Sequence, residues 1–201
     1  MMKPLILKRE TVYSGYLTVE RLKVRLADGA ETWLELEKHG EAVVILPFDA
    51  ARRCALVARL FRVAVFDMTG QEVLEEACAG MIGNEDSETA ARREAYEELG
   101  VRLKSLEFLG RVWSSPGVST ERHSLFLAPY TEADRVGAGG GAADEHEGIT
   151  VVERPLRELA AEADRGHVTD AKLLSLILAL RQRRPELFDD QQQAARNGIY
   201  R

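Results

Sequence analysis

Residues 79–101 read AGMIGNEDSETAARREAYEELGV, and this stretch decides how the rest of the 201-residue chain is interpreted. Asp86 or Ser87 can cap a helix here, because a short polar side chain accepts hydrogen bonds from the first free backbone N–H groups. The helix is expected to run to Leu99 and to end at Gly100, since glycine readily adopts the left-handed conformation that follows a last helical turn. The sequence therefore predicts one helix with clear bounds.

Three glutamates share one side of this expected helix. Glu94 and Glu98 lie about 40° apart around the helix axis, and Glu97 lies about 60° to the other side. Carboxylates at these spacings repel one another in water, and a cleft would increase the cost. A divalent cation removes that penalty, and clustered carboxylate oxygens suit Mg²⁺ or Mn²⁺. The alternative is a solvated acidic face on which Arg93 and Glu97 form an ordinary ion pair.

The spacing of these residues resembles the Nudix box, G-x5-E-x7-R-E-U-x-E-E-x-G-U, in which U is a bulky aliphatic residue. The glycines, the arginine and the glutamates of that pattern are matched by Gly80, Glu85, Arg93, Glu94, Glu97, Glu98 and Gly100. Two positions depart from it. Four residues instead of five separate Gly80 from Glu85, and Ala95 is small for the first U position.

This resemblance implies a fold and a reaction. The implied fold is α+β, an αβα sandwich around a mixed central sheet, and the implied reaction is hydrolysis of a nucleoside diphosphate linked to another moiety, with Mg²⁺ or Mn²⁺. By position, Glu94 and Glu98 would be the main metal ligands, Glu97 would lie near a second ion, and the backbone carbonyl of Ala79 would complete the set. Arg93 would orient the glutamates through an ion pair, so it joins Glu97 among the catalytic residues.

The similarity extends beyond the box, over roughly residues 37–180. The segments LFRVAVF, SSPGVSTE and GHVTDAKLLSL resemble the ADP-ribose and GDP-mannose pyrophosphatase branch of the family. This branch implies conversion of ADP-ribose to AMP and ribose 5-phosphate, with GDP-mannose or another nucleotide sugar as the alternative. A nucleoside-triphosphate pyrophosphatase and a non-catalytic nucleotide sensor remain further alternatives.

The same resemblance implies roles for residues outside the box. Arg62 would meet the phosphates or the base of the substrate, and Glu121 would contact the sugar. A mobile loop over residues 137–148 would bring Glu147 to the metal ions and Glu145 to the attacking water as general base. The alternatives are that Arg62 is an ordinary surface arginine, that Glu121 simply starts a strand, and that residues 137–148 form a solvated acidic loop.

The chain is expected to have three regions: an N-terminal β-ribbon over 1–40, a catalytic domain over 41–185 and a polar tail over 186–201. Apolar and charged residues alternate over 22–26 and again over 34–37, which predicts a hairpin. Such a ribbon is marginal alone, so it must pack on this chain or on a partner. Members of the branch often form homodimers that exchange this region, and the resemblance therefore implies a homodimer.

Short apolar runs at 42–46 and 54–58 predict buried strands, with the turn between them at 47–49. Other strands are expected near residues 59–65, 106–112, 124–129 and 149–152, and two more helices near 155–165 and 170–184, opened by Pro155 and capped by Asp170.

The composition is that of an ordinary globular protein. Lys and Arg number 27 and Asp and Glu number 33, which gives a net charge of −6 and argues against a general nucleic-acid binder. The two cysteines, Cys54 and Cys78, form neither a disulfide framework nor a zinc site, and buried thiols in a reducing compartment are expected. No apolar run approaches ~18 residues. We expect a cytoplasmic protein that binds neither nucleic acid nor membrane.

Overall fold

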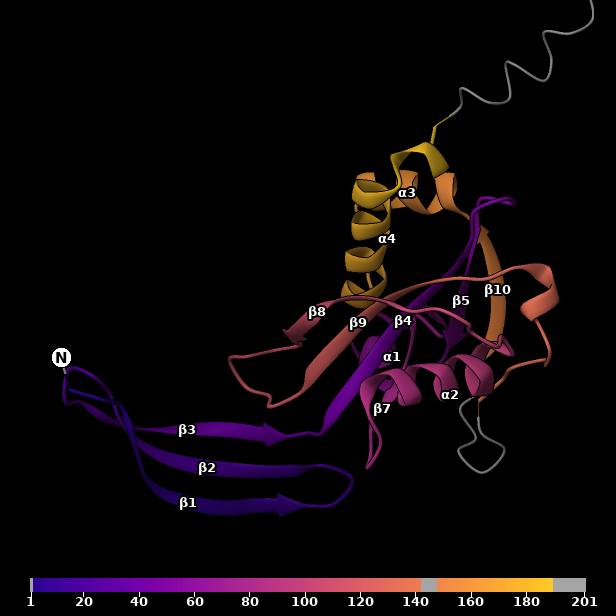
Figure 1. Cartoon of the computed structure of the whole chain (residues 1–201). Helices are drawn as coiled ribbons and strands as arrows, with labels where there is room; N and C mark the ends of the chain where they lie inside the picture. Colours follow the sequence, from indigo (N-terminus) through magenta and orange to yellow (C-terminus); the bar gives the residue numbers. More distant parts are fainter. Residues whose placement is uncertain (1, 142–147, 190–201) are drawn as a thin grey trace, which may run out of the picture.

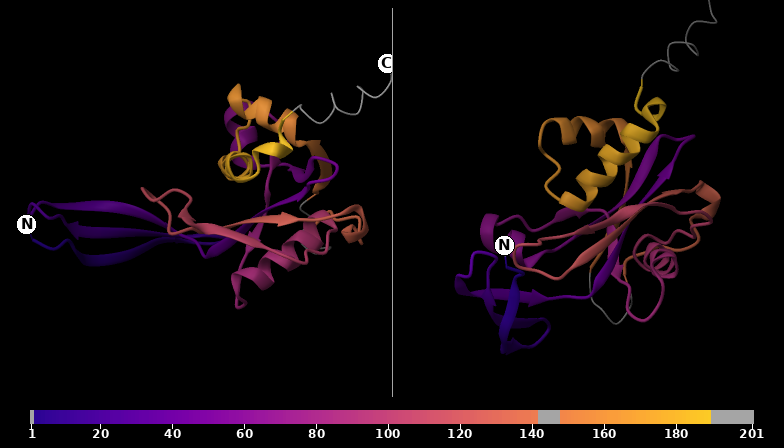
Figure 2. Two further views of the ribbon diagram at one scale, coloured as in Figure 1. Left: turned by 45° about the horizontal axis from the view of Figure 1, so that its top comes forward. Right: turned by 60° about the vertical axis from the view of Figure 1, so that its left-hand side comes forward.

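A computed structural model describes residues 2–141 and 148–189 of the chain. The N-terminal part is a three-stranded antiparallel sheet that stands out from the rest of the molecule as an extended ribbon (Figures 1 and 2). Its strands are β1 (Leu5–Ser14), β2 (Thr18–Arg25) and β3 (Glu31–Lys38). The expected hairpin corresponds to β2 and β3, and β1 is a third strand that the sequence pattern did not indicate.

The central sheet has the strand order β10-β5-β4-β9-β8, with β6 paired to β5 and β7 paired to β4. The strands are β4 (Glu41–Asp49), β5 (Cys54–Leu60), β6 (Leu74–Glu76), β7 (Cys78–Met81), β8 (Glu107–Trp113), β9 (Arg122–Pro129) and β10 (Thr150–Pro155). Strands β4 and β9 run parallel, whereas the other pairs are antiparallel. The sheet is therefore mixed, as expected.

Helices cover both faces of this sheet (Figure 1). Helix α2 (Ser87–Leu99) packs on one face, and α3 (Leu156–Asp164) and α4 (Ala171–Arg183) pack on the other. Strand β4 lies between the two cores, because Val43 and Ile45 face α2 whereas Val44 and Leu46 face α4. An apolar strand buried on both faces is what an unbroken aliphatic run predicts.

The helix bounds follow the expected capping residues. Asp86 accepts hydrogen bonds from the backbone N–H groups of Glu88 and Thr89, and Gly100 ends α2 in the left-handed conformation with φ 67°. Asp170 caps α4 in the same manner, accepting from the backbone of Lys172 and Leu173. The structure also has two short 3₁₀ helices, Glu132–Asp134 and Pro185–Leu187.

The structure corrects two expectations about local structure. Residues 47–49 continue β4 and do not form the turn, which follows them because the Asp49 carboxylate accepts from the backbone N–H groups of Ala51 and Arg52. The strand expected over 59–65 ends at Leu60, and the next element is a short helix, α1 (Val63–Thr69), none of whose residues is buried. Apolar residues are frequent in this segment, but within the described residues no neighbouring strand pairs with it beyond Leu60.

No helix among the described residues is long and apolar enough to span a membrane.

Candidate active site

Helix α2 lies close against the sheet because the side chains that face it are small. Ala90, Ala91 and Ala95 are fully buried, and Leu99 anchors the last turn in the same core. This close packing leaves the glutamates on the flank of the helix beside β7. Glu98 is only 4% exposed and is the most buried of the three glutamates of the helix stripe.

Arg93 is the centre of the charged groups on this flank. Its Nε donates to Glu85 Oε1 at 2.7 Å, and its Nη1 donates to Glu94 Oε1 at 2.8 Å and to Glu97 Oε2 at 2.9 Å. Burial alone would lower the pKa of Arg93, but these three carboxylates outweigh it and raise that pKa further above its usual range. We call Glu85, Arg93, Glu94 and Glu97 the α2 cluster.

The loop between Gly80 and Glu85 is one residue shorter than the Nudix pattern, yet Glu85 still reaches Arg93. Arg93 also donates from Nη2 to the backbone carbonyl of Met81 at 3.0 Å, which ties the helix to the end of β7. The shortened loop therefore does not separate the first acid of the pattern from the rest of the cluster.

Strand β7 contacts the glutamates of α2 directly. The backbone N–H of Ala79 donates to Glu98 Oε2 at 3.2 Å. A Cβ added at Gly80 would lie 2.0 Å from Cδ of Glu94, so only glycine leaves room for that carboxylate in its present position. The position of the Glu94 carboxylate thus explains on steric grounds why the motif begins with a glycine at residue 80.

Arg62, expected to bind substrate, faces a buried carboxylate of its own chain. Its Nε and Nη2 donate to the two oxygens of Glu76 at 2.7 and 3.0 Å. Glu76 also accepts from Lys172 Nζ at 3.1 Å, and Lys172 donates to Asp170 at 2.8 Å. We call Arg62, Glu76, Asp170 and Lys172 the α4 network. The sequence predicts roles only for Arg62 and for the cap Asp170, because no local pattern marks Glu76 or Lys172 as their partners.

The remaining predicted residues lie elsewhere or outside the described residues. Glu121 lies just before β9, and its carboxylate is 3.3 Å from His123 Nε2. Strand β4 separates β9 from β7, so the structure does not bring Glu121 against the α2 cluster. Glu145 and Glu147 lie outside the described residues, and their roles stay predictions.

Residues 38–177 match the model of the NUDIX domain. The chain belongs to the Nudix family. Two similar proteins are the GDP-mannose pyrophosphatases of Cronobacter sakazakii and Citrobacter koseri. The first is 34% identical over 150 residues, which cover 74% of this chain and 78% of that protein, and the second is 34% identical over 145 residues, which cover 71% and 74%.

The crystal structure of an ADP compounds hydrolase superimposes on this Nudix chain with a TM-score of 0.74 and 23% sequence identity. The match covers 92% of this chain and 96% of that chain. At this level of identity the likeness establishes the fold, and it confirms the αβα sandwich with a mixed sheet.

The charged groups beside β7 have the chemistry that a hard divalent cation requires. Carboxylate oxygens from Glu94, Glu97 and Glu98 are gathered along one flank of α2, and Gly80 leaves space beside Glu94. Within residues 2–141 and 148–189, no three acidic, histidine or cysteine side chains converge closely enough to form a metal site as they stand. Glu94 and Glu97 are instead directed to Arg93, and the metal ligands of this Nudix chain stay a prediction.

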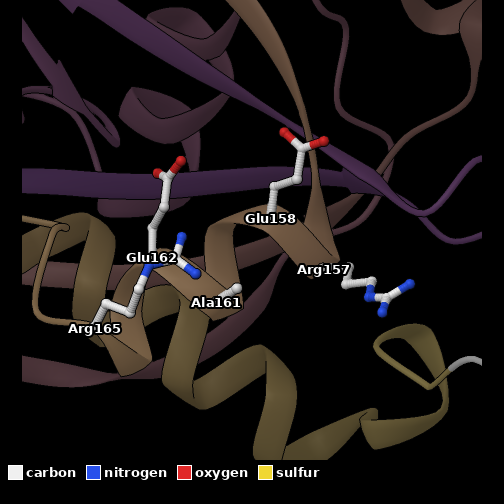
Figure 3. Close-up of a pocket in the computed structure, with 5 residues that line it drawn as sticks. All are labelled: Arg157, Glu158, Ala161, Glu162 and Arg165. Atoms are coloured by element: carbon white, nitrogen blue, oxygen red, sulfur yellow. The ribbon is translucent and has the colours of Figure 1, made fainter.

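Two surface hollows are lined by other parts of the Nudix chain. One of about 450 Å³ lies along α3, where Figure 3 shows Arg157, Glu158, Ala161, Glu162 and Arg165 on one side of the helix. The other, of about 690 Å³, lies beyond the end of β5 and is lined in part by Phe61, Val73 and Gly148. Neither hollow is lined by the glutamates of α2, so neither marks the candidate site.

Proposed function

We propose that this Nudix protein hydrolyses the pyrophosphate bond of a nucleoside diphosphate sugar with the help of a divalent metal ion. The observation that carries the proposal is the group of carboxylates at α2, where Glu85, Glu94 and Glu97 surround Arg93 and Glu98 contacts β7. Such a surplus of carboxylate suits binding of a cation together with the phosphates of a substrate. The names of the similar GDP-mannose pyrophosphatases support the same class of substrate.

In this reaction water adds to one phosphorus, the bridging P–O bond breaks, and two phosphomonoesters leave. A divalent cation bound at this site would neutralise charge on the phosphate oxygens and lower the pKa of the attacking water. Glu94 and Glu98 would hold that cation with Glu97 and the carbonyl of Ala79, and Arg93 would keep the glutamates oriented. Glu147 would join the ligands, and Glu145 would accept the proton of the attacking water.

Two substrates are to be compared. ADP-ribose, expected from the sequence, would give AMP and ribose 5-phosphate. GDP-mannose is the second candidate, because two relatives that are 34% identical bear the name of that activity. Arg62 and Glu121 are proposed as contacts of the phosphates and of the sugar, respectively, and Mg²⁺ is proposed as the metal with Mn²⁺ as the alternative.

The test is a substrate screen in which alkaline phosphatase releases phosphate only after the pyrophosphate bond has been cut. ADP-ribose, GDP-mannose, other nucleotide sugars and dinucleoside polyphosphates are offered with Mg²⁺ and, separately, with Mn²⁺. Nucleoside triphosphates carry a free terminal phosphate, so their cleavage is followed by chromatography. Cleavage of a nucleotide sugar supports the proposal. Cleavage of nucleoside triphosphates alone would instead support a nucleoside-triphosphate pyrophosphatase. Binding of a nucleotide without any cleavage would support a non-catalytic nucleotide sensor.

We also propose that the protein is a homodimer joined through residues 1–40, with the catalytic domain over 41–185 and a polar tail over 186–201. The ribbon supports this, because Leu22 is the only large apolar side chain that is buried within residues 2–40, whereas Ile6 and Leu34 are 45% and 50% exposed. Leu34 pairs with Leu22 across β2 and β3, so the two share one face. Light scattering should show that Leu34→Glu shifts the protein to monomer, whereas Glu35→Gln, on the other face, does not.

A location in the cytoplasm is part of the same proposal. Cys54 and Cys78 are both buried and no disulfide joins them, which suits a reducing compartment.

A further inference from the structure

Strand β7 is held from both faces of the central sheet. On one side α2 contacts it, since Glu98 accepts the N–H of Ala79 and Arg93 donates to the carbonyl of Met81. On the other side, the carboxylate of Asp170 at the start of α4 accepts the backbone N–H of Ala77 at 3.2 Å. Ala77 lies between β6 and β7, two residues before Ala79. One short segment therefore connects the two helices.

Asp170 does more than cap its helix. Its Oδ2 accepts from the backbone N–H of Leu173 at 3.0 Å and from that of Ala77 at 3.2 Å, and its side chain is 6% exposed. A cap needs only the bonds to its own helix, as Asp86 illustrates at the start of α2. The bond to Ala77 spans 93 residues of sequence and ties α4 to the segment that enters β7.

Lys172 adds a second contact between α4 and this segment, at Glu76, the residue before Ala77. Its Nζ lies 2.8 Å from Asp170 and 3.1 Å from Glu76, whose carboxylate is held on its other side by Arg62. Glu76 is 3% exposed, so water does not replace these partners. Consecutive residues, Glu76 through its side chain and Ala77 through its backbone, are thus both fixed by the N-terminus of α4 immediately before β7 begins.

We propose that Asp170 and Lys172 are positioning residues that hold β7 in alignment with the glutamates of α2. Ala79 and Gly80, the residues of β7 that contact Glu98 and Glu94, lie two and three residues beyond this anchor. A binding site loses much of its affinity when a supporting group moves by about 1 Å. Loss of the contacts at Glu76 and Ala77 would therefore shift β7 relative to the glutamates of α2. The consequence for metal binding rests on the proposed function, whereas the alignment of β7 does not.

Asp170→Ser in the full chain separates positioning from capping. Serine is a good helix cap, but its single hydroxyl cannot serve α4 and also reach the N–H of Ala77. Backbone amide exchange of the metal-free protein is measured by NMR, with Phe126 in β9 as the internal reference. We expect exchange at Ala77 to accelerate about tenfold relative to Phe126, because a buried hydrogen bond is lost. Exchange at Ala79 should accelerate by a smaller but clear factor.

A second readout follows the proposed metal site. Titration with Mn²⁺ alone, observed by electron paramagnetic resonance, should show about tenfold weaker binding to Asp170→Ser than to the wild type. The half-saturating Mg²⁺ concentration for nucleotide-sugar cleavage should rise by a similar factor.

Leu180→Ala is the matched control. Leu180 is fully buried in α4 near its far end, so this variant lowers the melting temperature through a cavity and leaves Asp170 in place. It should accelerate exchange at Ala79 and Phe126 by the same ratio and leave Mn²⁺ affinity unchanged. Asp170→Asn keeps an oxygen that can accept from Ala77, and it should restore much of the protection at Ala79 relative to Asp170→Ser.

The proposal is overturned if Asp170→Ser resembles Leu180→Ala in both readouts, with Ala79 and Phe126 accelerated equally. Should Asp170→Ser not fold, Lys172→Met is measured in the same two assays, and the same equality overturns the proposal. If the wild type neither binds Mn²⁺ nor cuts any nucleotide, the proposed function fails, while the exchange ratio at Ala79 still decides whether α4 positions β7.

Discussion

The α2 cluster and the α4 network lie on opposite sides of β7 and are built from the same kinds of side chain, yet their charges are balanced differently. In the α2 cluster, three carboxylates surround the single guanidinium of Arg93, and Glu98 adds a fourth nearby. In the α4 network, two carboxylates face two cations, Arg62 and Lys172. One group carries a surplus of negative charge, whereas the other is neutral as a whole.

Burial follows the same division. The carboxylates of the α4 network, Glu76 and Asp170, are 3% and 6% exposed, whereas those of the α2 cluster, Glu85, Glu94 and Glu97, are 27%, 12% and 33% exposed. Buried charges must be paired within the protein, because an unpaired charge loses its hydration without compensation. A partly exposed surplus can instead be neutralised by a cation from solution. The difference supports a structural role for Glu76, Asp170 and Lys172, and it supports the proposed metal site at the α2 cluster.

Neutralising one ligand on the α2 side should have the largest effect on activity. Glu98→Gln keeps the side chain's shape and an oxygen that can accept from Ala79, so the protein should fold with a nearly unchanged melting temperature. Metal-dependent turnover should fall about 100- to 1000-fold, since a metal ion supplies several kcal/mol of charge stabilisation. Initial rates at saturating Mg²⁺ measure this loss.

Glu88→Gln is the matched control for Glu98→Gln. Glu88 belongs to the same helix, but its side chain is 63% exposed and pairs only loosely with Arg92, at 3.7 Å. The control should retain wild-type turnover. Equal rates for Glu98→Gln and Glu88→Gln would show that Glu98 is not a metal ligand. They would favour the alternative that the glutamates of α2 form a solvated acidic face.

Breaking the α4 network should act on stability first. Lys172→Met removes the ammonium group that lies between Glu76 and Asp170 and leaves two buried carboxylates with one cation fewer. We expect the free energy of unfolding to fall by about 3 kcal/mol, at the lower end of the losses found when one partner of a buried ion pair is removed. Urea denaturation measures it, and Lys104→Met, which removes an ion pair at an exposed lysine, should cost less than about 1 kcal/mol. A similar small loss at both sites would show that the α4 network is not the anchor we describe.

Gly80→Ala should affect the α2 side with little change in stability. The three heavy atoms nearest to the added Cβ all belong to the carboxylate end of Glu94, the nearest at 2.0 Å, and Gly80 does not have a positive φ. Glu94 must therefore move while the backbone stays, and we expect turnover to fall about tenfold or more, with a melting temperature within a few degrees of wild type.

Gly100→Ala provides the opposite result at the end of the same helix. Gly100 has φ 67°, and a Cβ there would lie 2.2 Å from the backbone oxygen of Gly137, so the fold itself must yield. Differential scanning fluorimetry should show a large loss of stability for Gly100→Ala only. If Gly80→Ala is as unstable as Gly100→Ala, the contact with Glu94 is not what requires glycine at residue 80.

The sequence predicts the α2 side of the molecule well, because its signals are local. Caps at Asp86 and Gly100, and glutamates spaced three and four residues apart, are properties of one continuous segment, and the structure confirms the helix they predict. The same applies to the apolar runs of β4 and β5, which are buried on both faces. Local patterns of this kind do not depend on which distant segments meet.

The α4 side could not be predicted in the same way, because its contacts join residues that are far apart in sequence. Glu76 and Lys172 are 96 residues apart, and nothing in either local segment indicates the other. The expected strand over 59–65 is wrong beyond Leu60 for a related reason, since an apolar segment forms a strand only where a neighbouring strand is present to pair with it, and that depends on distant residues. Arg62 illustrates the limit, because nothing in its local segment predicts its pairing with Glu76, which lies 14 residues further along the chain.

The smallest expected effect is a change in how stability depends on pH. Burial would raise the pKa of Glu76, but Arg62 and Lys172 outweigh it and hold this pKa below its ordinary value of 4.5. A carboxyl group with a lowered pKa in the folded state stabilises the protein fully above the unfolded-state pKa, and this contribution is lost as pH falls through the folded-state pKa. Glu76→Gln removes the charge, so the variant should be less stable than wild type at pH 7, and the gap should narrow below about pH 4.5. Urea denaturation from pH 7 to pH 3 measures the gap. Glu72→Gln, in the exposed segment before β6, is the control, and its difference in stability from wild type should not change with pH. If the difference for Glu76→Gln is also constant with pH, then Arg62 and Lys172 do not stabilise the ionised form of Glu76.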